Sequence, residues 1–311
     1  GDFASYRWGN TVDPITPGLT ERPYVARELV PYGTPMSADL LNSLDLRLQE
    51  RTLEPESLAP LARLLRAGDL VIRGDLQFER YNLARPRLVW RLVQRAPGLS
   101  EPIPLTGPTA NRPIARLPMH DEVWLLQEQG LDDSPAVAVV PVDDVPTIVD
   151  LKPAEGAVLL SGDGAGIVDA AAAELIDGTE LIRYSASLDP DEVAAELDRG
   201  ASLVVTDGNR KRGERWVSLR HTRGHTERVD ETQLAENLTD NRLRRFPDAG
   251  SDVQTVAIQR GGIQVDATSY GNPITFTPED RPASSLDGDT GTTWRVAAFD
   301  EAIGQSIVVD L

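Results

Sequence analysis

The sequence contains no cysteine, and histidine occurs only at His120, His221 and His225 among its 311 residues. The absence of cysteine excludes disulfides, thiolate metal sites and a cysteine nucleophile. Three histidines are too few for a histidine-rich metal centre. His221 and His225 have helical spacing, but Gly224 lies between them and no glutamate completes a metalloprotease motif. We therefore interpret this stretch as a surface loop.

Positive charge and aromatic residues are also scarce. Lysine and arginine number 31 against 49 acidic residues, which gives a formal net charge of -18, and aromatic residues make up 5%. A chain this acidic is repelled by a phosphate backbone, so no nucleic acid is expected as a partner. An anionic membrane surface is disfavoured for the same reason. Neutral glycans or cations fit this charge better.

No hydrophobic run reaches the roughly 20 apolar residues that a bilayer crossing takes. The best run, Ala136–Val142, is ended by Asp143 and Asp144. The opening segment, Gly1–Trp8, has neither the charged nor the apolar part of a secretory signal peptide, and there is no initiator methionine. We expect the chain to be a soluble, extracytoplasmic piece of a longer protein.

Hydrophobic residues at 40% and charged residues at 26% are close to globular averages, and ~100–200 residues per domain predicts two or three domains. The first predicted unit, residues 1–150, mixes helical and strand patterns. Helices are expected at Ser37–Glu50, with Ser37 as a cap, and at Pro55–Arg66, and a loop at Gly98–Pro118. Strands are expected at Asp69–Arg73, Leu88–Gln94, Ala136–Val142 and Thr147–Leu151.

The second predicted unit, residues 151–250, alternates strands with helices. Strands are expected at Ala157–Ser161, Leu181–Ser185 and Leu203–Thr206, and helices at Ile167–Ile176 and Asp189–Arg199. This alternation predicts a small parallel α/β (flavodoxin-like) domain. A polar, arginine-rich connection, Asn209–Arg245, follows it.

The third predicted unit, residues 251–311, changes to short strands separated by glycine and proline. They are expected at Thr255–Gln259, Ile263–Ala267, Ile274–Thr277 and Ser306–Leu311. The predicted fold class is therefore mixed α/β and multi-domain. It combines a small parallel α/β layer domain with a β-rich, β-sandwich-like C-terminal segment.

The glycine-rich turn Gly162–Gly166 lies between a predicted strand and a predicted helix, where phosphate-binding loops occur. Its spacing matches neither the dinucleotide fingerprint nor a Walker loop. Residues that follow the third strand of the same sheet can share its edge and form a ligand or cation site. The candidate ligand-binding residues are Gly162, Asp163, Gly164, Asp207, Asn209 and Arg210. The alternative, which we favour, is a set of solvated turns.

The segment Leu286–Trp294 fits the pattern Asp-Gly-Asp-x-x-Thr-x-Trp. Its oxygens from Asp287, Asp289 and Thr292 can bind a structural Ca²⁺, and a loop held by hydrogen bonds alone is equally compatible. With Trp294-Arg295 and Gln305–Leu311, the motif resembles the opening of a coagulation-factor 5/8 type C (discoidin-like) domain. The resemblance implies a sugar-binding β-sandwich, often with a structural Ca²⁺, and we expect this one to be cut off at Leu311.

Four segments give the whole chain a second resemblance: Trp8–Pro14, Arg73–Tyr81, Ser161–Gly164 and Ser269–Pro273. In this order they resemble the large soluble portion of actinobacterial alpha-(1→3)-arabinofuranosyltransferases, which are GT-C type membrane glycosyltransferases. The resemblance implies arabinose transfer from a decaprenyl-phosphate donor to cell-wall arabinan. It places the catalytic carboxylate in a membrane core that this chain lacks, so no catalytic residue is carried over.

Three hypotheses follow. The first is a non-catalytic ectodomain, tethered to the membrane core of its parent protein, that positions or binds arabinan or arabinogalactan acceptor glycan. The second is an independent enzyme or ligand-binding domain that uses Gly162–Gly166 and Asp207. The third is a structural spacer without a ligand. Asp13 and Asp75 lie in the family-like segments and can equally fix turns.

Overall fold

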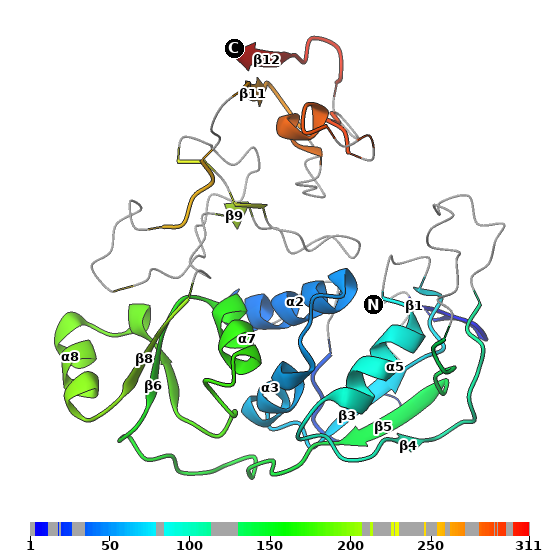
Figure 1. Ribbon diagram of the computed structural model, residues 1–311, viewed down its shortest axis with the longest axis vertical. Helices are drawn as coiled ribbons and strands as arrows, with labels where there is room; N and C mark the ends of the chain where they lie inside the picture. The colour runs from blue at the N-terminus through cyan, green and yellow to red at the C-terminus, as the bar shows by residue number, and fades with distance from the viewer. Residues whose placement is uncertain are drawn as a thin grey trace.

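The computed structural model describes residues 4–11, 18, 20–26, 35–78, 84–112, 130–206, 212–213, 225–226, 228–229, 246, 254–258, 262–270, 280–288, 290, 292–296 and 301–310. Figure 1 shows an α/β body at one end of the long axis and strands β11 and β12 at the other end. The α-helices are α2 (Pro35–Glu50), α3 (Leu58–Leu64), α5 (Pro86–Arg95), α7 (Gly164–Ala172) and α8 (Pro190–Asp198), and the 3-10 helices are η1 (Pro55–Ser57), η2 (Ser185–Ser187) and η5 (Pro282–Ser285). The strands are β1 (Ala4–Tyr6), β2 (Gly9–Thr11), β3 (Asp69–Arg73), β4 (Ile103–Pro104), β5 (Val137–Pro141), β6 (Val158–Ser161), β7 (Ile182–Tyr184), β8 (Ser202–Val205), β9 (Arg212–Gly213), β10 (His225–Thr226), β11 (Gln264–Ala267) and β12 (Ile307–Asp310).

Strand β6 is the centre of a three-stranded parallel sheet with the order β7-β6-β8. Val158 on β6 pairs with Ile182 on β7 and with Ser202 on β8. All four residues of β6 are buried, which is typical of a parallel strand covered on both faces. Figure 1 shows α7 on one side of this sheet and α8 on the other. The predicted parallel α/β layer is confirmed.

Both helices beside this sheet begin after an aspartate cap. Asp189 accepts a hydrogen bond from the amide of Glu192 at 2.7 Å, and the Glu192 carboxylate accepts one from the amide of Asp189 at 3.0 Å, which makes a capping box before α8. Helix α7 begins at Gly164, three residues earlier than predicted, because Asp163 caps it. A cap stabilises a helix start by about 1 kcal/mol, which offsets the low helix propensity of one glycine.

Strand β5 lies between β3 and β4 in an antiparallel sheet. Leu70 on β3 pairs with Val140, and Ile103 on β4 pairs with Val139. Ala138 and Val140 are fully buried, and the alternate residues Val137, Val139 and Pro141 are half-buried. This alternation is expected of a strand with one face on a core. The strands predicted at residues 69–73 and 136–142 are confirmed.

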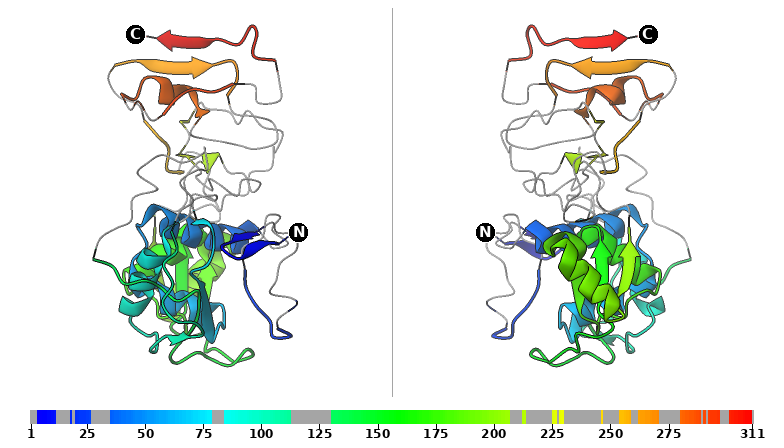
Figure 2. Two further views of the ribbon diagram at one scale, coloured as in Figure 1. Left: turned by 90° about the vertical axis from the view of Figure 1, so that its right-hand side faces the viewer. Right: turned by 90° about the vertical axis from the view of Figure 1, so that its left-hand side faces the viewer.

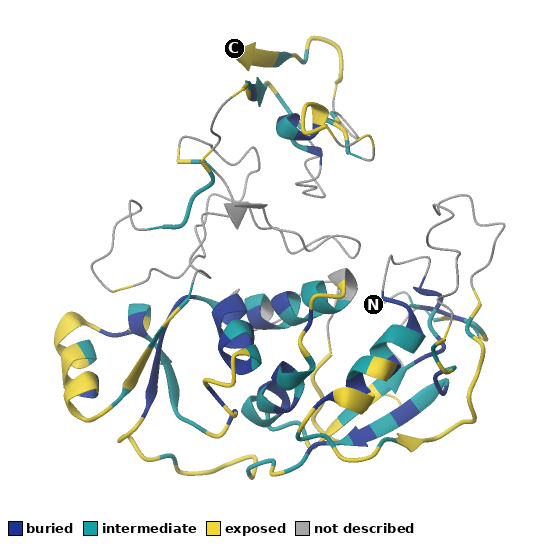
Figure 3. Ribbon diagram, viewed as in Figure 1, coloured by how far each residue is buried: buried dark blue, intermediate teal, exposed yellow. Residues whose placement is uncertain are grey.

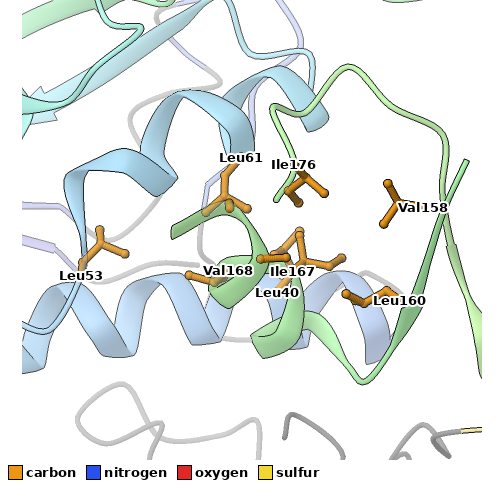
Figure 4. Close-up of a cluster of buried hydrophobic side chains, with 10 residues drawn as sticks. Leu40, Leu53, Leu61, Val158, Leu160, Ile167, Val168 and Ile176 are labelled. Carbon is orange, nitrogen blue, oxygen red and sulfur yellow. The ribbon is translucent and has the colours of Figure 1, made fainter. Parts of the chain in front are cut away.

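One hydrophobic core joins the first two predicted units. Helices α2 and α3 contribute Leu40 and Leu61, β6 contributes Leu160, and α7 contributes Ile167 and Val168. Figure 4 shows these side chains gathered between the three helices and the strand. The helices predicted at residues 37–50 and 55–66 therefore pack against the parallel layer. The division of the chain at residue 150 stays a prediction, and this core spans it.

The strand predicted at Leu88–Gln94 is wrong, because this segment lies within helix α5. Trp90 and Val93 are buried at helical spacing, and Arg91 and Gln94 on the opposite side are exposed. Pro86 occupies the first helical position, where its missing N–H costs nothing. The apolar residues suggested a strand, but their period of three to four residues is that of an amphipathic helix.

Other sequence-based predictions of local structure are also wrong. Thr147–Leu151 forms no strand, and Ile148 and Leu151 in it are 74% and 100% exposed. β-Branched residues favour a strand only when they can pack against neighbours. Ser37 is not a cap, because α2 begins at Pro35. Residues 254–258 contain an isolated bridge rather than a strand, and the strand predicted at Ile274–Thr277 lies outside the described residues.

The C-terminal segment contains the antiparallel pair β11–β12, in which Val265 pairs with Val309. Figure 2 shows the two strands side by side, beyond the α/β body. The strands predicted at residues 263–267 and 306–311 are confirmed. Within the described part of residues 251–311, one strand pair and η5 do not make two packed sheets, so a discoidin-like module stays a prediction.

Exposure follows these layers, as Figure 3 shows, with β6 buried and most of α8 exposed. Glu196 is the buried residue of α8. Its Oε1 atom accepts a hydrogen bond from Arg183 at 2.5 Å and lies 2.6 Å from Arg199, so β7 and α8 are joined by charge. None of the helices in the described ranges has the length and apolar character needed to cross a membrane.

Candidate functional site

The backbone amides at the start of α7 donate to carboxylates of the chain itself. The Asp163 side chain accepts hydrogen bonds from the amides of Ala165 at 3.0 Å and Gly166 at 3.3 Å. Asp39 on α2 accepts one from the amide of Gly164 at 2.8 Å. A phosphate bound at a helix N-terminus would use these same amides. The two carboxylates therefore stand where an anionic ligand of the glycine-rich turn would bind.

The glycines of this turn are required by close packing. A Cβ atom on Gly164 would lie 2.4 Å from the backbone nitrogen of Leu40, so α2 approaches α7 too closely for a side chain. A Cβ atom on Gly162 would lie 2.1 Å from Oγ1 of Thr206, which follows β8. Both contacts are far inside van der Waals distance. Packing explains the glycine pattern without a ligand.

The phenol of Tyr184 lies near the same carboxylates. Burial raises the pKa of Tyr184 above its ordinary value, and the charges of Asp39 and Asp163 raise it further. Tyr184 therefore keeps its proton in the folded state beyond the pH at which an ordinary tyrosine ionises. The structure thus places Asp163 and Gly164 together with Asp39 and Tyr184, two residues that the sequence did not single out for this edge. Helix packing between α2 and α7 brings them there, and nothing in the local pattern signals it.

The remaining candidates of this edge, Asp207, Asn209 and Arg210, lie outside the described residues. A ligand site that includes them stays a prediction.

The predicted Ca²⁺ loop is held by hydrogen bonds. The Thr292 hydroxyl lies 2.9 Å from Oδ1 and 2.7 Å from Oδ2 of Asp287, and 3.1 Å from the carbonyl oxygen of Ser284. Asp289 lies outside the described residues. Among the residues that are described, no three acidic or histidine side chains gather as a metal-ligand set. Asp287 and Thr292 alone are far short of the six to eight oxygens that Ca²⁺ takes, so the metal stays a prediction.

A second cluster lies at the N-terminal hairpin, where Trp8 is stacked on Tyr6. The ring centroids are 4.8 Å apart and the ring planes differ by 5°. The guanidinium of Arg73 on β3 lies over the Tyr6 ring, 4.4 Å from its centroid. We call Tyr6, Trp8, Arg73 and Asp75 the aromatic platform. Stacking of this kind contributes about 0.5–1.5 kcal/mol per aromatic pair beyond the buried area.

Asp75 joins the parts of the aromatic platform. It accepts two parallel hydrogen bonds from Arg73, from Nε to Oδ1 at 2.9 Å and from a terminal nitrogen to Oδ2 at 2.8 Å. Its Oδ2 atom also accepts from the indole Nε1 of Trp8 at 2.8 Å. Only 9% of the Asp75 side chain is exposed. Bidentate bonds to a nearly buried carboxylate fix both donors in place.

The hairpin β1–β2 is itself held against the segment after β3. The amide of Arg7 donates to the carbonyl of Asp75 at 2.8 Å, and the amide of Gln77 donates to Ser5 at the same distance. The Gln77 side-chain amide donates to the carbonyl of Tyr6 at 2.8 Å. Asn111 donates to the carbonyl of Leu76 at 2.8 Å and accepts from the Arg7 guanidinium. Hydrogen bonds to the backbone therefore hold the hairpin that carries Tyr6 and Trp8 in place.

Within this rigid setting, Trp8 remains 62% exposed, whereas Tyr6 is 7% exposed. One face of the Trp8 ring is covered by Tyr6 and its N–H is already bonded, so the opposite face is the one that can stack against a ligand. Sequence reasoning placed Trp8 and Asp75 in family-like segments but assigned neither to a site. The signal was the pair of segments Trp8–Pro14 and Arg73–Tyr81, and their contact could not be read from spacing.

A family model described as alpha-(1→3)-arabinofuranosyltransferase, N-terminal GT-C domain, matches residues 1–240 of the chain. The chain is also similar to the alpha-(1→3)-arabinofuranosyltransferase of Mycolicibacterium smegmatis, with 24% identity over 318 residues that cover 99% of this chain and 22% of the relative. Its counterpart in Mycobacterium tuberculosis is 25% identical over 320 residues, with 99% and 21% covered. The chain thus spans about a fifth of the length of these relatives.

Among solved structures, the chain is similar to a single-particle cryo-EM structure of a mutant of arabinofuranosyltransferase AftD from mycobacteria. The TM-score is 0.57 at 21% sequence identity, over 99% of this chain and 24% of that one. At this identity the likeness concerns the fold. It extends over the α/β body and the C-terminal segment alike.

Proposed function

Because the chain belongs to the alpha-(1→3)-arabinofuranosyltransferase family, in the region of its N-terminal GT-C domain, we propose that it is a non-catalytic ectodomain that positions the acceptor glycan. The chain is part of an arabinofuranosyltransferase of the AftD type. The acceptor in this proposal is cell-wall arabinan or arabinogalactan. Transfer itself takes place elsewhere in the parent protein, on its membrane core, with this segment on the extracytoplasmic side.

The observation that carries the proposal is the exposed, fixed indole of Trp8. A sugar ring has an apolar face of C–H groups and a polar edge of hydroxyls, so it fits a flat aromatic face bordered by polar groups. Tyr6 and Asp75 hold the Trp8 ring at 4.8 Å and 2.8 Å, respectively. A side chain ordered before binding loses little rotamer entropy, which improves affinity. The platform thus suits a neutral glycan.

Charge supports the same class of ligand. The net charge of -18 repels polyanions over most of the surface but does not oppose a neutral polysaccharide. Stacking on one ring is a weak interaction, which suits an acceptor that must be released and rebound.

The competing hypothesis of an independent ligand-binding edge at Gly162–Gly166 has less support. The carboxylates of Asp39 and Asp163 accept the hydrogen bonds that an anion would take there. The proposal also includes a Ca²⁺ at Asp287 and a discoidin-like, sugar-binding module that contains the C-terminal strands, both outside the platform. The hypothesis of a spacer without a ligand does not account for the Trp8 indole, which is exposed and yet fixed by a hydrogen bond to Asp75.

The test is isothermal calorimetry of the chain with arabinan oligosaccharides at millimolar concentration. Wild type is expected to bind, Trp8→Ala to lose at least about tenfold in affinity, and Trp8→Phe to lose less, because one aromatic contact is worth about 1–3 kcal/mol. Asp75→Asn should weaken binding although Trp8 is present, because the ring loses its anchor. Absence of binding by wild type, or equal binding by Trp8→Ala, would refute the proposal.

A further inference from the structure

A short groove with a mostly apolar lining lies between the end of α2, η1 and α5, on elements that do not form the aromatic platform. Its volume is about 190 Å³. Seven of its ten lining residues are apolar, among them Leu48, Leu53 and Leu92. The other three are Arg51, Arg91 and Arg95, and no acidic residue is in the lining. The lining thus has no acidic residue, although the chain has a net charge of -18.

The two arginines of α5 in this groove differ from their neighbour on the same helix. Arg87 is paired with Asp133, to which its Nε donates at 2.8 Å. Arg91 and Arg95 are both exposed, and neither has a hydrogen-bond or ion-pair partner among the residues that the structure describes. They are four residues apart, so their side chains leave the same face of the helix. A pair of guanidinium groups in the lining of a mostly apolar groove is suited to a phosphate, which arginine binds in a bidentate manner.

We propose that this groove binds one phosphate-bearing phospholipid of a bilayer surface, with the phosphate on Arg91 and Arg95 and the upper part of an acyl chain on the leucines. The groove, at about 190 Å³, is too small to bind an amphipathic helix, because such a helix needs a groove long enough for side chains at i, i+4 and i+7. Its volume also lies below the ~300–1,000 Å³ of ordinary small-molecule pockets. A single alkyl segment fits the space.

The proposal departs from the expectation that the acidic chain avoids an anionic surface. That expectation holds for the net charge, which acts on the whole surface through a screened field. Within about a Debye length individual charges act with less screening, and Arg91 and Arg95 at the groove have the sign that attracts a phosphate. Each basic residue near an anionic bilayer contributes about 1 kcal/mol of attraction, so two of them change binding by tenfold or more.

Flotation with vesicles tests this proposal on the whole chain. Vesicles of phosphatidylglycerol in phosphatidylcholine are compared with phosphatidylcholine alone, at low ionic strength. We expect wild type to bind the mixed vesicles and Arg91→Glu/Arg95→Glu to lose at least about tenfold in partitioning. The matched control Arg22→Glu/Arg112→Glu makes the same change of charge at two exposed arginines outside the groove, and should bind as wild type does. Equal losses in both pairs would overturn the proposal, since they would indicate non-specific attraction.

A second experiment distinguishes binding of the whole lipid from binding of its phosphate headgroup alone. Calorimetry with short-chain phosphatidylglycerol below its micelle concentration should show binding, and glycerol 3-phosphate should bind at least about tenfold more weakly, because it has no acyl chain to bury. Equal affinity for both would assign the arginines to a free phosphate and contradict the proposal of a bound lipid.

Sedimentation velocity of wild type and Arg91→Glu/Arg95→Glu provides a last check. A change from dimer to monomer would assign the groove to a second copy of the chain, and no change is expected.

Discussion

The carboxylate of Asp39 on α2 accepts a hydrogen bond from the backbone amide of Gly164 at the start of α7, at 2.8 Å and across 125 positions of the sequence. This contact joins the two helices that meet in the main core. It also neutralises the positive end of α7, where aligned peptide dipoles favour a negative charge. The first turn of α7 therefore depends on a side chain from another region of the chain.

Asp39→Ala should destabilise the fold by about 1–2 kcal/mol, because a helix-terminal amide loses its acceptor and the helix dipole loses its charge. The measurement is urea unfolding followed by circular dichroism. Glu101→Gln removes an acidic charge from an exposed loop and is the matched control. A control change as large as that of Asp39→Ala would mean that net charge, and not this contact, accounts for the loss.

Gly166→Ala should be destabilising although alanine is the better helix former. Its Cβ atom would lie 2.4 Å from Oγ1 of Thr206, and overpacking of this kind costs about 1–3 kcal/mol. Thr206→Ala removes Oγ1 and Cγ2 but keeps the Cβ atom at 3.2 Å, so the double variant should recover part of the loss. A double-mutant cycle by chemical denaturation gives the coupling, which we expect to be about 1 kcal/mol or more. Gly107→Ala, with no atom within 4 Å, should be nearly neutral.

The stability of the fold should fall at alkaline pH through Tyr184. In the unfolded chain a tyrosine ionises near pH 10.0, whereas burial and two carboxylates raise the pKa of Tyr184 in the folded state. Above pH 10.0 the unfolded state loses this proton and the native state keeps it, so unfolding becomes easier as pH rises. Urea midpoints on both sides of this pH should fall more steeply for wild type than for Tyr184→Phe. Equal slopes would show that Tyr184 ionises freely in the native state.

The stability of the fold should fall at acid pH through protonation of Glu196. Hydrogen bonds from Arg199 and then from Arg183 outweigh burial and lower the pKa of Glu196 below its ordinary value of 4.5. The stabilisation is present above pH 4.5 and is lost as pH falls through the lowered pKa of the native state. Glu196→Gln should therefore flatten the acid limb of stability against pH. The contrary result, an unchanged acid limb, would mean that the two arginines do not favour the charged carboxylate.

Local patterns predicted the parallel layer well. Continuous apolar runs in β6 and β8, an aspartate-proline helix start before α8 and the alternation of elements are all short-range signals. The apolar content of Leu88–Gln94 favours a strand as much as a helix, and only the period that puts Trp90 and Val93 on one face distinguishes helix α5. The segment at Ile148 failed as a strand because β-branched composition says nothing of whether a partner strand is near.

The candidate sites were harder to predict, because they depend on contacts between distant segments. Asp39 meets Gly164 only once α2 packs on α7, and Trp8 meets Asp75 only once the hairpin lies against β3. Each residue looks ordinary in its own segment. The glycine-rich turn has a strong local pattern, yet its three glycines, Gly162, Gly164 and Gly166, are required by the close packing of α2 and of Thr206 against the turn. Local signals therefore indicated a place in the fold but not the chemistry there.

The most direct test of the glycan proposal is the indole N–H spectrum of the ¹⁵N-labelled chain during titration with arabinan oligosaccharides. The chain has five tryptophans, and Trp8→Phe identifies the signal of Trp8. The account predicts that the Trp8 signal moves in a saturable manner. The signals of Trp90, which is buried, and Trp294, whose N–H is bonded to Ser269 at 2.9 Å, should stay in place. A Trp8 signal that does not move at saturating sugar would contradict the claim that this residue receives the acceptor.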